Sequence, residues 1–333
     1  MSPAPTARRA SAALISLLLL GLLAACSGGT ASSDSSGAGG AGFPVTVRDK
    51  FGSATVPAKP VRVVAMDWTD ADFALSLGIK PVGIARVDTV DGGIQPWTKT
   101  ALGDARPTLF ETTDGDPVEQ VAALAPDVIL ATKDYNLSHS YAQLSKVAPV
   151  VTYTNAPNTD SWQQDFSLIG QALGQAAKAR TITTDTENTI TRDKREHPEL
   201  SGKTFSYIVA PSASGAYTVN STTDVSAQLL NSLGLTLSPK VISLPTSSTP
   251  GRAQVSLENL GVLDADVVLA AGSSGALATL KANPLFGKLS AVQRGSYVPL
   301  AYTTASAIAF PSPASLDWAL NQVLPKLSAA AKA

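Results

Sequence analysis

Several residue types are scarce in this chain of 333 residues, and each shortage excludes a class of protein. A single cysteine excludes any disulfide within the chain, so its domains must rely on apolar cores. Only two histidines, His139 and His197, are present, which argues against a bare metal ion as ligand and against a serine–histidine triad. Lysine and arginine (25) balance aspartate and glutamate (26), and no block is basic enough to predict a nucleic-acid partner.

The N-terminal segment has the layout of an export signal. Arg8 and Arg9 precede an apolar run over residues 12–23, which is too short to span a bilayer comfortably. The run leads into Leu-Ala-Ala-Cys, which resembles a bacterial lipobox ending at Cys26, the only cysteine. We therefore predict a signal peptide over residues 1–25 and lipidation of Cys26. Ordinary cleavage that leaves Cys26 as a free thiol is the alternative.

A tether is predicted directly after this cysteine. Residues 27–42 (SGGTASSDSSGAGGAG) offer almost no side chain that could be buried, which is typical of a flexible linker. No later stretch is long and apolar enough to predict a transmembrane helix. We expect a monomer on the extracytoplasmic face of the cell membrane, with residues 26–42 as lipid anchor and tether and the anchor as its only link to the membrane.

Short apolar strands alternate with helical segments on both sides of the middle of the chain. This alternation predicts an α/β fold of two lobes, residues 43–158 and 199–333, each with a mainly parallel sheet covered by helices. Ligands of such sheets bind beyond the carboxyl ends of the strands. The strands are expected over residues 60–65, 82–85, 127–131, 150–153, 204–210, 266–271 and 297–300.

Residues 159–198 predict a helical connection between the lobes. Apolar residues at steps of three and four share one face, and Ser161 with Gln164 forms a plausible capping box. His197 precedes a proline, which ends a helix. Whether the helix is continuous through Gly174 stays open at this point. We expect a long, rigid interlobe helix.

One sequence unit occurs twice, once on each side of this helix. Glu119 lies eight residues before Asp127 and an apolar strand, and Glu258 lies eight residues before Asp266 and another. Stabilisation of a helix N-terminus by an acidic residue would account for either glutamate alone. It accounts less well for a matched pair, one in each lobe.

These segments, in this order, resemble substrate-binding lipoproteins of ABC importers in the iron–siderophore, cobalamin and haem group. The resemblance runs from about Phe43 to Leu327. It implies a ligand cleft between two lobes that a rigid helix joins, with only small opening and closing. It also implies that Glu119 and Glu258 dock onto arginines of the permease dimer. The segments that carry it are residues 61–65, 77–83, 124–130, 144–151, 169–174, 257–270, 283–286 and 311–318.

Aromatic residues and two arginines in predicted loops or at strand ends are the candidate ligand contacts. Aromatic rings suit a large, partly apolar chelate and stack on a cationic one, and arginine donates to anionic oxygens. For Tyr153 and Trp97 the main alternative is that they are core residues. For Arg252 the alternative is a charged side chain in a solvated loop. The candidates are Trp68, Arg86, Tyr135, Tyr153, Tyr217, Arg252 and Tyr302.

The charges near these positions bear on which chelate is bound. The cationic residues near the candidate positions are at most Arg86, Lys133 and Arg252, and Asp67, Asp70 and Asp134 lie beside them in the sequence. A ferric tris-catecholate carries several negative charges and would need a cluster of arginine and lysine. The balance favours a neutral or weakly cationic chelate, so a ferric hydroxamate siderophore is expected. Haem, with a tyrosine as axial ligand, and cobalamin stay open. No resident cofactor, metal site or catalytic residue is expected.

Two other protein classes were weighed against a binding protein. An exported α/β hydrolase would need a nucleophile with a base, and the sequence has no G-x-S-x-G elbow. An adhesion or scaffold protein at the cell surface is the third class. The duplicated glutamates and the resemblance favour the binding protein, which is not an enzyme.

Overall fold

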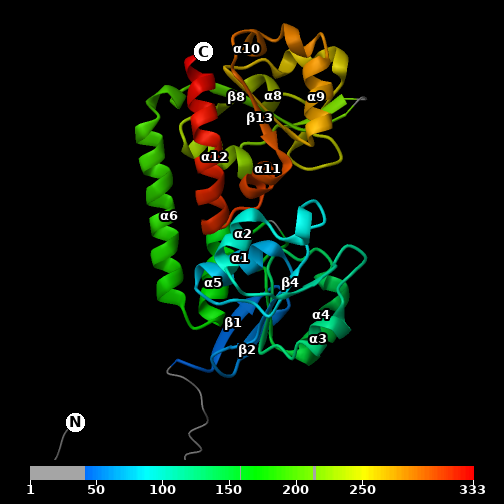
Figure 1. The fold of residues 1–333 in the computed structure, drawn as a ribbon, viewed down its shortest axis with the longest axis vertical. Coiled ribbons are helices and arrows are strands. Elements are labelled where there is room, and N and C mark those ends of the chain that lie inside the picture. The colour runs from blue at the N-terminus through cyan, green and yellow to red at the C-terminus, as the bar shows by residue number, and fades with distance from the viewer. Residues whose placement is uncertain (1–41, 158, 213–214) are drawn as a thin grey trace, which may run out of the picture. The chain divides into compact units, whose positions relative to one another are not determined.

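The structure is a computed structural model that describes residues 42–333 apart from 158, 213 and 214 (Figure 1). Cys26, the predicted signal peptide and most of the predicted tether lie outside the described residues. The described residues belong to one compact unit. Of the helices in the described part, none has the length and apolar character that crossing a membrane requires.

The N-terminal lobe is built on a five-stranded parallel sheet in the order β5-β4-β3-β6-β7. Its central strands are buried on both faces, as parallel strands covered by helices should be. An antiparallel hairpin of β1 (Val45–Asp49) and β2 (Gly52–Val56) precedes the sheet. The other elements are β3 (Val63–Ala65), α1 (Trp68–Ser76), β4 (Gly83–Ala85), η1 (Asp91–Gly93), α2 (Pro96–Leu102), β5 (Thr108–Phe110), α3 (Val118–Ala123), β6 (Val128–Ala131), α4 (Leu137–Val147) and β7 (Val150–Thr152).

The C-terminal lobe has a six-stranded sheet in the order β11-β9-β8-β12-β13, with β10 also paired to β8. Strands β10, β8, β12 and β13 run parallel, whereas β9 and β11 are antiparallel additions. Its elements are β8 (Thr204–Ser212), β9 (Gly215–Val219), α7 (Val225–Ser232), β10 (Thr236–Leu237), α8 (Pro239–Ile242), β11 (Arg252–Val255), η3 (Leu257–Leu263), β12 (Val267–Gly272), α9 (Ser274–Ala282), η4 (Phe286–Lys288), α10 (Ser290–Gln293), β13 (Tyr297–Ala301), α11 (Tyr302–Ala309) and α12 (Pro313–Lys332).

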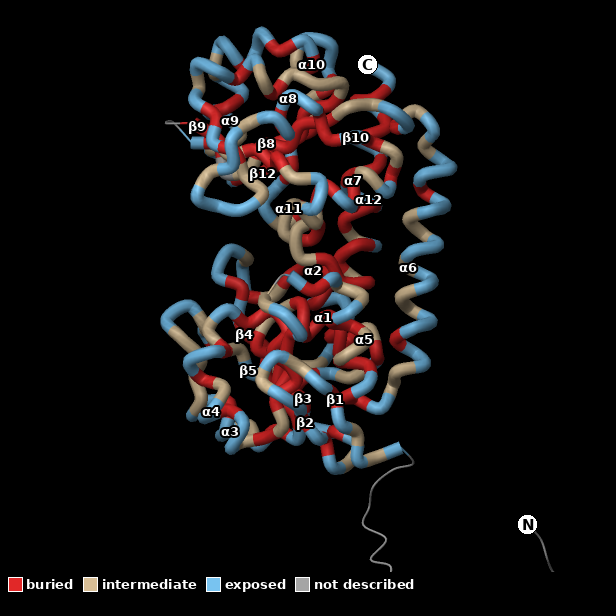
Figure 2. Tube along the Cα trace, turned by 180° about the vertical axis from the view of Figure 1, so that it is seen from behind, coloured by how far each residue is buried: buried red, intermediate tan, exposed pale blue. Residues whose placement is uncertain are grey.

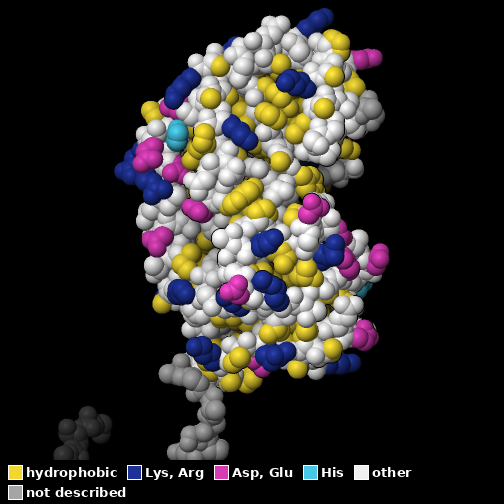
Figure 3. Space-filling view, viewed as in Figure 1, with side chains coloured by type: hydrophobic (Ala, Val, Ile, Leu, Met, Phe, Trp, Pro, Cys, Tyr) yellow, Lys and Arg dark blue, Asp and Glu magenta, His cyan; other side chains and the backbone are white. Residues whose placement is uncertain are grey.

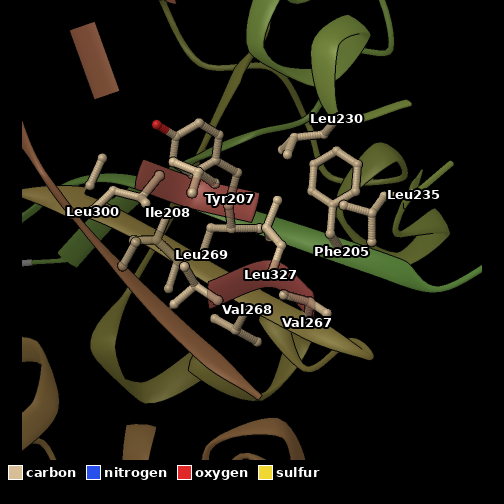
Figure 4. Close-up of a cluster of buried hydrophobic side chains, with 14 of the residues drawn as sticks. Phe205, Tyr207, Ile208, Leu230, Leu235, Val267, Val268, Leu269, Leu300 and Leu327 are labelled. Atoms are coloured by element: carbon tan, nitrogen blue, oxygen red, sulfur yellow. The ribbon is translucent and has the colours of Figure 1, made fainter. Parts of the chain in front are cut away.

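Figure 4 shows the core of this lobe, where side chains of the central strands meet those of the covering helices. Phe205 and Tyr207 of β8 pack with Leu269 of β12, and helices α7 and α12 contribute Leu230 and Leu327. Burying such side chains away from water is the main stabilising contribution in a chain without disulfides. The predicted fold class, two lobes with mainly parallel sheets covered by helices, is confirmed.

The connection between the lobes consists of two helices rather than one. Helix α5 (Trp162–Ala172) begins at the capping box that Ser161 and Gln164 form, and its apolar face packs into the N-terminal lobe. Gly174 then adopts φ +68°, and a β-carbon there would lie 2.6 Å from the ring of Phe43. The break is therefore fixed both by backbone conformation and by packing, which answers the question that the sequence left open.

Helix α6 (Ala176–Glu196) is the long interlobe helix, and it is followed by η2 (Pro198–Leu200). Figure 2 shows most of it as exposed or intermediate, and within the helix Ala179 and Asp193 are the buried residues. Its N-terminal end packs on α5, while its C-terminal end reaches α7 and η2. These contacts hold the helix near its two ends, and α12 contacts it as well.

A second connection, α12, was not expected from the sequence. This C-terminal helix contacts α6 along its side and packs on α1 and α2 of the N-terminal lobe before it enters the C-terminal lobe (Figure 1). Trp318 of α12 lies with its ring centroid 5.1 Å from that of Trp97 in α2. Trp97 is buried and belongs to the apolar cluster of the C-terminal lobe, so it is a core residue shared by both lobes.

The duplicated aspartates have the same structural role in both lobes. Asp127 accepts hydrogen bonds of 2.8 and 2.7 Å from the backbone N–H groups of Val61 and Arg62, just before β3. Asp266 accepts bonds of 2.7 Å each from the backbone N–H and hydroxyl of Thr204, the first residue of β8. Each aspartate thus holds the start of a central strand.

Candidate ligand-binding cleft

Three neighbouring strands of the N-terminal lobe bring candidate residues together at one edge of the sheet. Arg86 follows β4, Trp68 lies three residues after β3, and Tyr135 lies four residues after β6. Adjacent strands are about 4.8 Å apart, so the three strand ends span roughly 10 Å. Asp67 caps α1, because its carboxylate accepts a 2.7 Å hydrogen bond from the Thr69 N–H, and this fixes where Trp68 begins the helix.

Trp68 contacts the other lobe. Its ring packs edge-on against Phe310, which follows α11, with centroids 5.4 Å apart and planes at 78°. Its indole Nε1 is enclosed and has no hydrogen-bond partner among the described residues. An enclosed N–H without an acceptor is unfavourable, so this group lacks the partner that a buried donor usually has.

Two tyrosines are exposed where parallel strands end. Tyr135 is 66% exposed beyond β6, and Tyr302 is 54% exposed at the start of α11, directly after β13 of the C-terminal lobe. Tyr217 lies in β9 opposite Val209 and is partly exposed. Exposed rings on both lobes are what contact with a large organic ligand requires.

Arg86 is not a free cation. Its Nε lies 3.6 Å from a carboxylate oxygen of Asp88 and 3.3 Å from one of Glu111, and the arginine side chain is 44% exposed. A hydrogen bond with Asp88 raises the pKa of the Glu111 carboxyl, although Arg86 acts in the opposite direction. Figure 3 shows acidic side chains gathered on one flank of this lobe. Little of the positive charge of Arg86 is left for an anionic ligand.

Tyr153 requires a correction. It follows the edge strand β7, is only 6% exposed, and packs against Phe51 with ring centroids 6.0 Å apart. Its backbone carbonyl accepts a hydrogen bond from the N–H of Lys50. The β1–β2 hairpin covers this strand end, so Tyr153 is part of the core and does not line an open cleft.

Arg252 also requires a correction. It is the first residue of β11 and pairs with Val219 of β9. The end of β8 lies opposite Gly215, which is four residues away from Val219 along β9. Four residues of strand correspond to about 13 Å, so Arg252 lies away from the edge where ligands bind. Its Nη1 lies 2.5 Å from a carboxylate oxygen of Asp224, the N-cap of α7. It is a paired strand residue rather than a loop charge or a cleft donor.

A buried ion pair beneath the strand ends was missed. Lys133, which follows β6, lies 2.5 Å from a carboxylate oxygen of Asp165 in α5, and the two side chains are 6% and 1% exposed. Desolvation raises the pKa of Asp165 to about 6 even though the lysine charge lowers it. The spacing of apolar residues in α5 could not reveal that Asp165 is buried in an ion pair, because its partner Lys133 follows β6.

Further carboxyl groups lie close to the same edge. Asp70 accepts hydrogen bonds from the backbone N–H (3.1 Å) and the hydroxyl of Thr132, and desolvation followed by the charge of Asp67 raises its pKa well above the usual range. Desolvation also raises the pKa of Asp67 to about 6 and that of Asp134 to about 7. The edge is therefore acidic or neutral near pH 7, and a polyanion would be repelled there.

The paired glutamates lie on the surface of separate lobes. Glu119 is in the first turn of α3 and Glu258 in the first turn of η3, and both are exposed. Neither makes a hydrogen bond or ion pair with another described residue. Both side chains are therefore free to contact another protein.

The histidines take no part in this cleft. His139 is exposed in the first turn of α4, and His197 ends α6 with its Nδ1 3.2 Å from Glu199. Within residues 42–333, leaving out 158, 213 and 214, no group of His, Cys, Asp and Glu side chains has an arrangement suited to holding a metal ion.

Comparison with known proteins identifies the family. The family model described as "Periplasmic binding protein" matches residues 63–300, which is well over half of the chain. The chain belongs to the periplasmic binding protein family. Its members are binding proteins, so the hydrolase alternative falls and this protein is not an enzyme.

Individual relatives of this periplasmic binding protein match over most of its length. A periplasmic solute binding protein from Mycobacterium smegmatis is 30% identical, with a TM-score of 0.76 over 86% of this chain and 98% of that one. PiaA of Streptococcus pneumoniae, in complex with ferrichrome, is 28% identical, with a TM-score of 0.72 over 86% and 99%. The Fe(3+)-citrate-binding protein YfmC of Bacillus subtilis is 26% identical over 75% of this chain and 76% of its own.

Proposed function

We propose that this periplasmic binding protein captures a ferric siderophore of the hydroxamate type between its two lobes and delivers it to the permease of an ABC importer. The observation that carries the proposal is the pair of exposed rings, Tyr135 and Tyr302, at strand ends of opposite lobes. Trp68, whose indole N–H has no hydrogen-bond partner among the described residues, follows the neighbouring strand β3.

The charges at this edge support a neutral or weakly cationic chelate. Arg86 is shared by two carboxylates, Lys133 is bound to Asp165, and Arg252 is bound to Asp224. Ferric trihydroxamates carry little or no net charge, whereas ferric catecholates and ferric citrates are anionic. The relative found with ferrichrome supports this choice.

Ferric citrate is the second candidate, because YfmC is named as a ferric citrate binder. It would need cations that the cleft edge does not leave free. Arg86, if released from Asp88 and Glu111, would be the one cation among the candidate residues retained at this edge. We therefore rank the hydroxamate first and expect ferric citrate to bind more weakly.

Fluorescence titration of the full-length protein tests this proposal, because Trp68 lies at the cleft edge. The ligands are ferrichrome, ferrioxamine B, ferric enterobactin, ferric citrate, haem and cobalamin. Saturable quenching by the two hydroxamates, with weaker or no response to the others, is expected. Saturation by enterobactin, citrate, haem or cobalamin alone would overturn the assignment to hydroxamates.

The remaining parts of the delivery system belong to the same proposal. Export by the signal peptide over residues 1–25 and lipidation of Cys26 would hold a monomer at the extracytoplasmic face of the membrane. Glu119 and Glu258 would then meet the permease dimer, one from each lobe. Their exposure and their lack of partners among the described residues support this role.

A further inference from the structure

A second cavity lies on the side of the protein where α6 runs. It has a volume of about 470 Å³ and is lined by residues that precede and begin α5, by the C-terminal half of α6, by α7 and by the segment that follows α11. Trp68, Arg86, Tyr135 and Tyr302 do not line it. Phe310 lines it and also packs against Trp68, so this residue contacts both the cavity and the cleft edge.

The cavity lies along one side of α6. The helix packs on α5 at one end and on α7 and η2 at the other, while Glu187, Ile190 and Thr191 face the space between. The walls are largely apolar, and the volume lies in the range that holds small organic ligands. The apolar lining residues are Trp162, Ile190, Val225, Leu229, Ala309, Phe310, Pro311 and Leu316.

Most polar groups in the lining already have partners. Lys133 is paired with Asp165, and the carboxylate of Asp160 accepts hydrogen bonds from the backbone N–H groups of Thr154 and Asn155. A carboxylate oxygen of Glu187 accepts a 3.0 Å bond from the amide of Gln163. These groups leave little spare polarity at the N-terminal-lobe end of the cavity.

Lys194 is the exception at the opposite end. It lines the cavity, is exposed, and makes no ion pair or hydrogen bond with any described residue. It lies in the last turn of α6, seven residues or about 10 Å along the helix from Glu187. The site therefore combines aromatic and aliphatic walls with one unpaired cation at one end.

We propose that this cavity binds a small aromatic carboxylic acid, with its rings between Trp162 and Phe310 and its carboxylate against Lys194. The apolar walls favour the rings, and the ammonium group supplies a charge-assisted hydrogen bond.

The test is a titration of the full-length protein with 1-naphthoate, followed by tryptophan fluorescence and by calorimetry. Saturable binding is expected, and the neutral analogue 1-naphthalenemethanol should bind about tenfold more weakly because it lacks the charge. Lys194→Gln should weaken naphthoate binding to the level of the neutral analogue. Arg195→Gln, which removes a neighbouring charge in the same last turn, should change neither affinity.

Two further variants place the ligand. Ile190→Trp fills the cavity from α6 and should abolish binding of both compounds, with an unchanged melting temperature showing that the fold is intact. Tyr135→Ala at the cleft should leave naphthoate binding unchanged. The proposal is overturned if naphthoate fails to saturate, if Lys194→Gln and Arg195→Gln behave alike, or if the Tyr135 variant loses binding.

Discussion

The hydroxyl of Ser312 donates a 3.1 Å hydrogen bond to the carboxylate of Asp72, 240 residues earlier in the chain. Asp72 belongs to α1 of the N-terminal lobe, and Ser312 is the N-cap of α12. The same carboxylate accepts bonds of 2.6 Å from the indole N–H of Trp97 and 2.5 Å from the hydroxyl of Thr98. All four side chains are buried, so this network ties α12 to the N-terminal lobe.

Asp72 should make stability depend on pH. Desolvation raises its pKa to about 7, above the ordinary value of 3.8, although its hydrogen bonds lower it. Between these values the folded protein holds a proton that the unfolded chain has lost, so the free energy of unfolding falls as pH rises, by up to about 1.4 kcal/mol per unit. Denaturant titrations at pH 5 and pH 8 should show a smaller loss in Asp72→Asn. Asp317→Asn, exposed on α12, is the control and should keep the wild-type difference.

Ser312→Ala should destabilise the protein by more than the loss of a helix cap alone. A lost N-cap costs about 1 kcal/mol, and the bond to Asp72 adds about 1 kcal/mol more. Ser273→Ala is the matched variant, because Ser273 caps α9 but is exposed and has no bond to the other lobe. Equal losses in urea denaturation for the two variants would show that the interlobe bond contributes nothing.

Removing Glu119 and Glu258 together should separate transport from binding. We expect the double alanine variant to bind the ferric hydroxamate with unchanged affinity, because both side chains are exposed and neither makes a hydrogen bond or ion pair with another described residue. Cellular uptake of the radiolabelled chelate should be abolished, with each single variant impaired. Glu196→Ala, an exposed change on α6, serves as control. A loss of ligand affinity in the double variant would mean that the glutamates serve the ligand and not the permease.

The two exposed tyrosines should each matter for ligand affinity. Stacking on an aromatic ring contributes about 1 kcal/mol, so Tyr135→Ala and Tyr302→Ala should each weaken ferrichrome binding by roughly fivefold to tenfold. Tyr153→Phe should leave the affinity unchanged, because this ring lies in the core. Fluorescence titration measures all three, and wild-type affinity in both alanine variants would contradict the proposed cleft.

Lipidation at Cys26 predicts how the protein partitions in the cell. Wild-type protein should take up labelled palmitate and sediment with membranes, whereas Cys26→Ser should stay unlabelled. Its binding of ferric hydroxamate should not change, because the ligand is bound by the lobes. Labelling of the serine variant would place the lipid elsewhere.

The sequence predicted features whose cause is local. The alternation of strands and helices reflects burial of successive segments, and the Ser161 capping box needs only residues three apart. The repeated aspartates could be found as a pattern, but that Asp127 and Asp266 hold strand starts could not, since their partners lie about 62 to 66 residues earlier.

The sequence failed where a residue's place depends on a distant element. Tyr153 follows a parallel strand as the candidates do, and only the β1–β2 hairpin packed over it removes it from the edge. The sequence around Arg252 predicts a loop, whereas in the structure an antiparallel strand sets the position of this residue and its side chain pairs with Asp224. The role of α12 depends on contacts with α1 and α2, more than 200 residues away in sequence, which a helical period cannot reveal.

The contact between Trp97 and Trp318 gives the protein an optical reporter of its own. The two ring centroids lie 5.1 Å apart with the planes tilted by 48°, close enough for the electronic transitions of the indoles to couple and to give a paired signal in circular dichroism. One indole belongs to α2 of the N-terminal lobe and the other to α12, so the amplitude of that signal reports how α12 is packed on that lobe. Loosening of this packing, by denaturant or by Ser312→Ala, can thus be followed in the unlabelled protein.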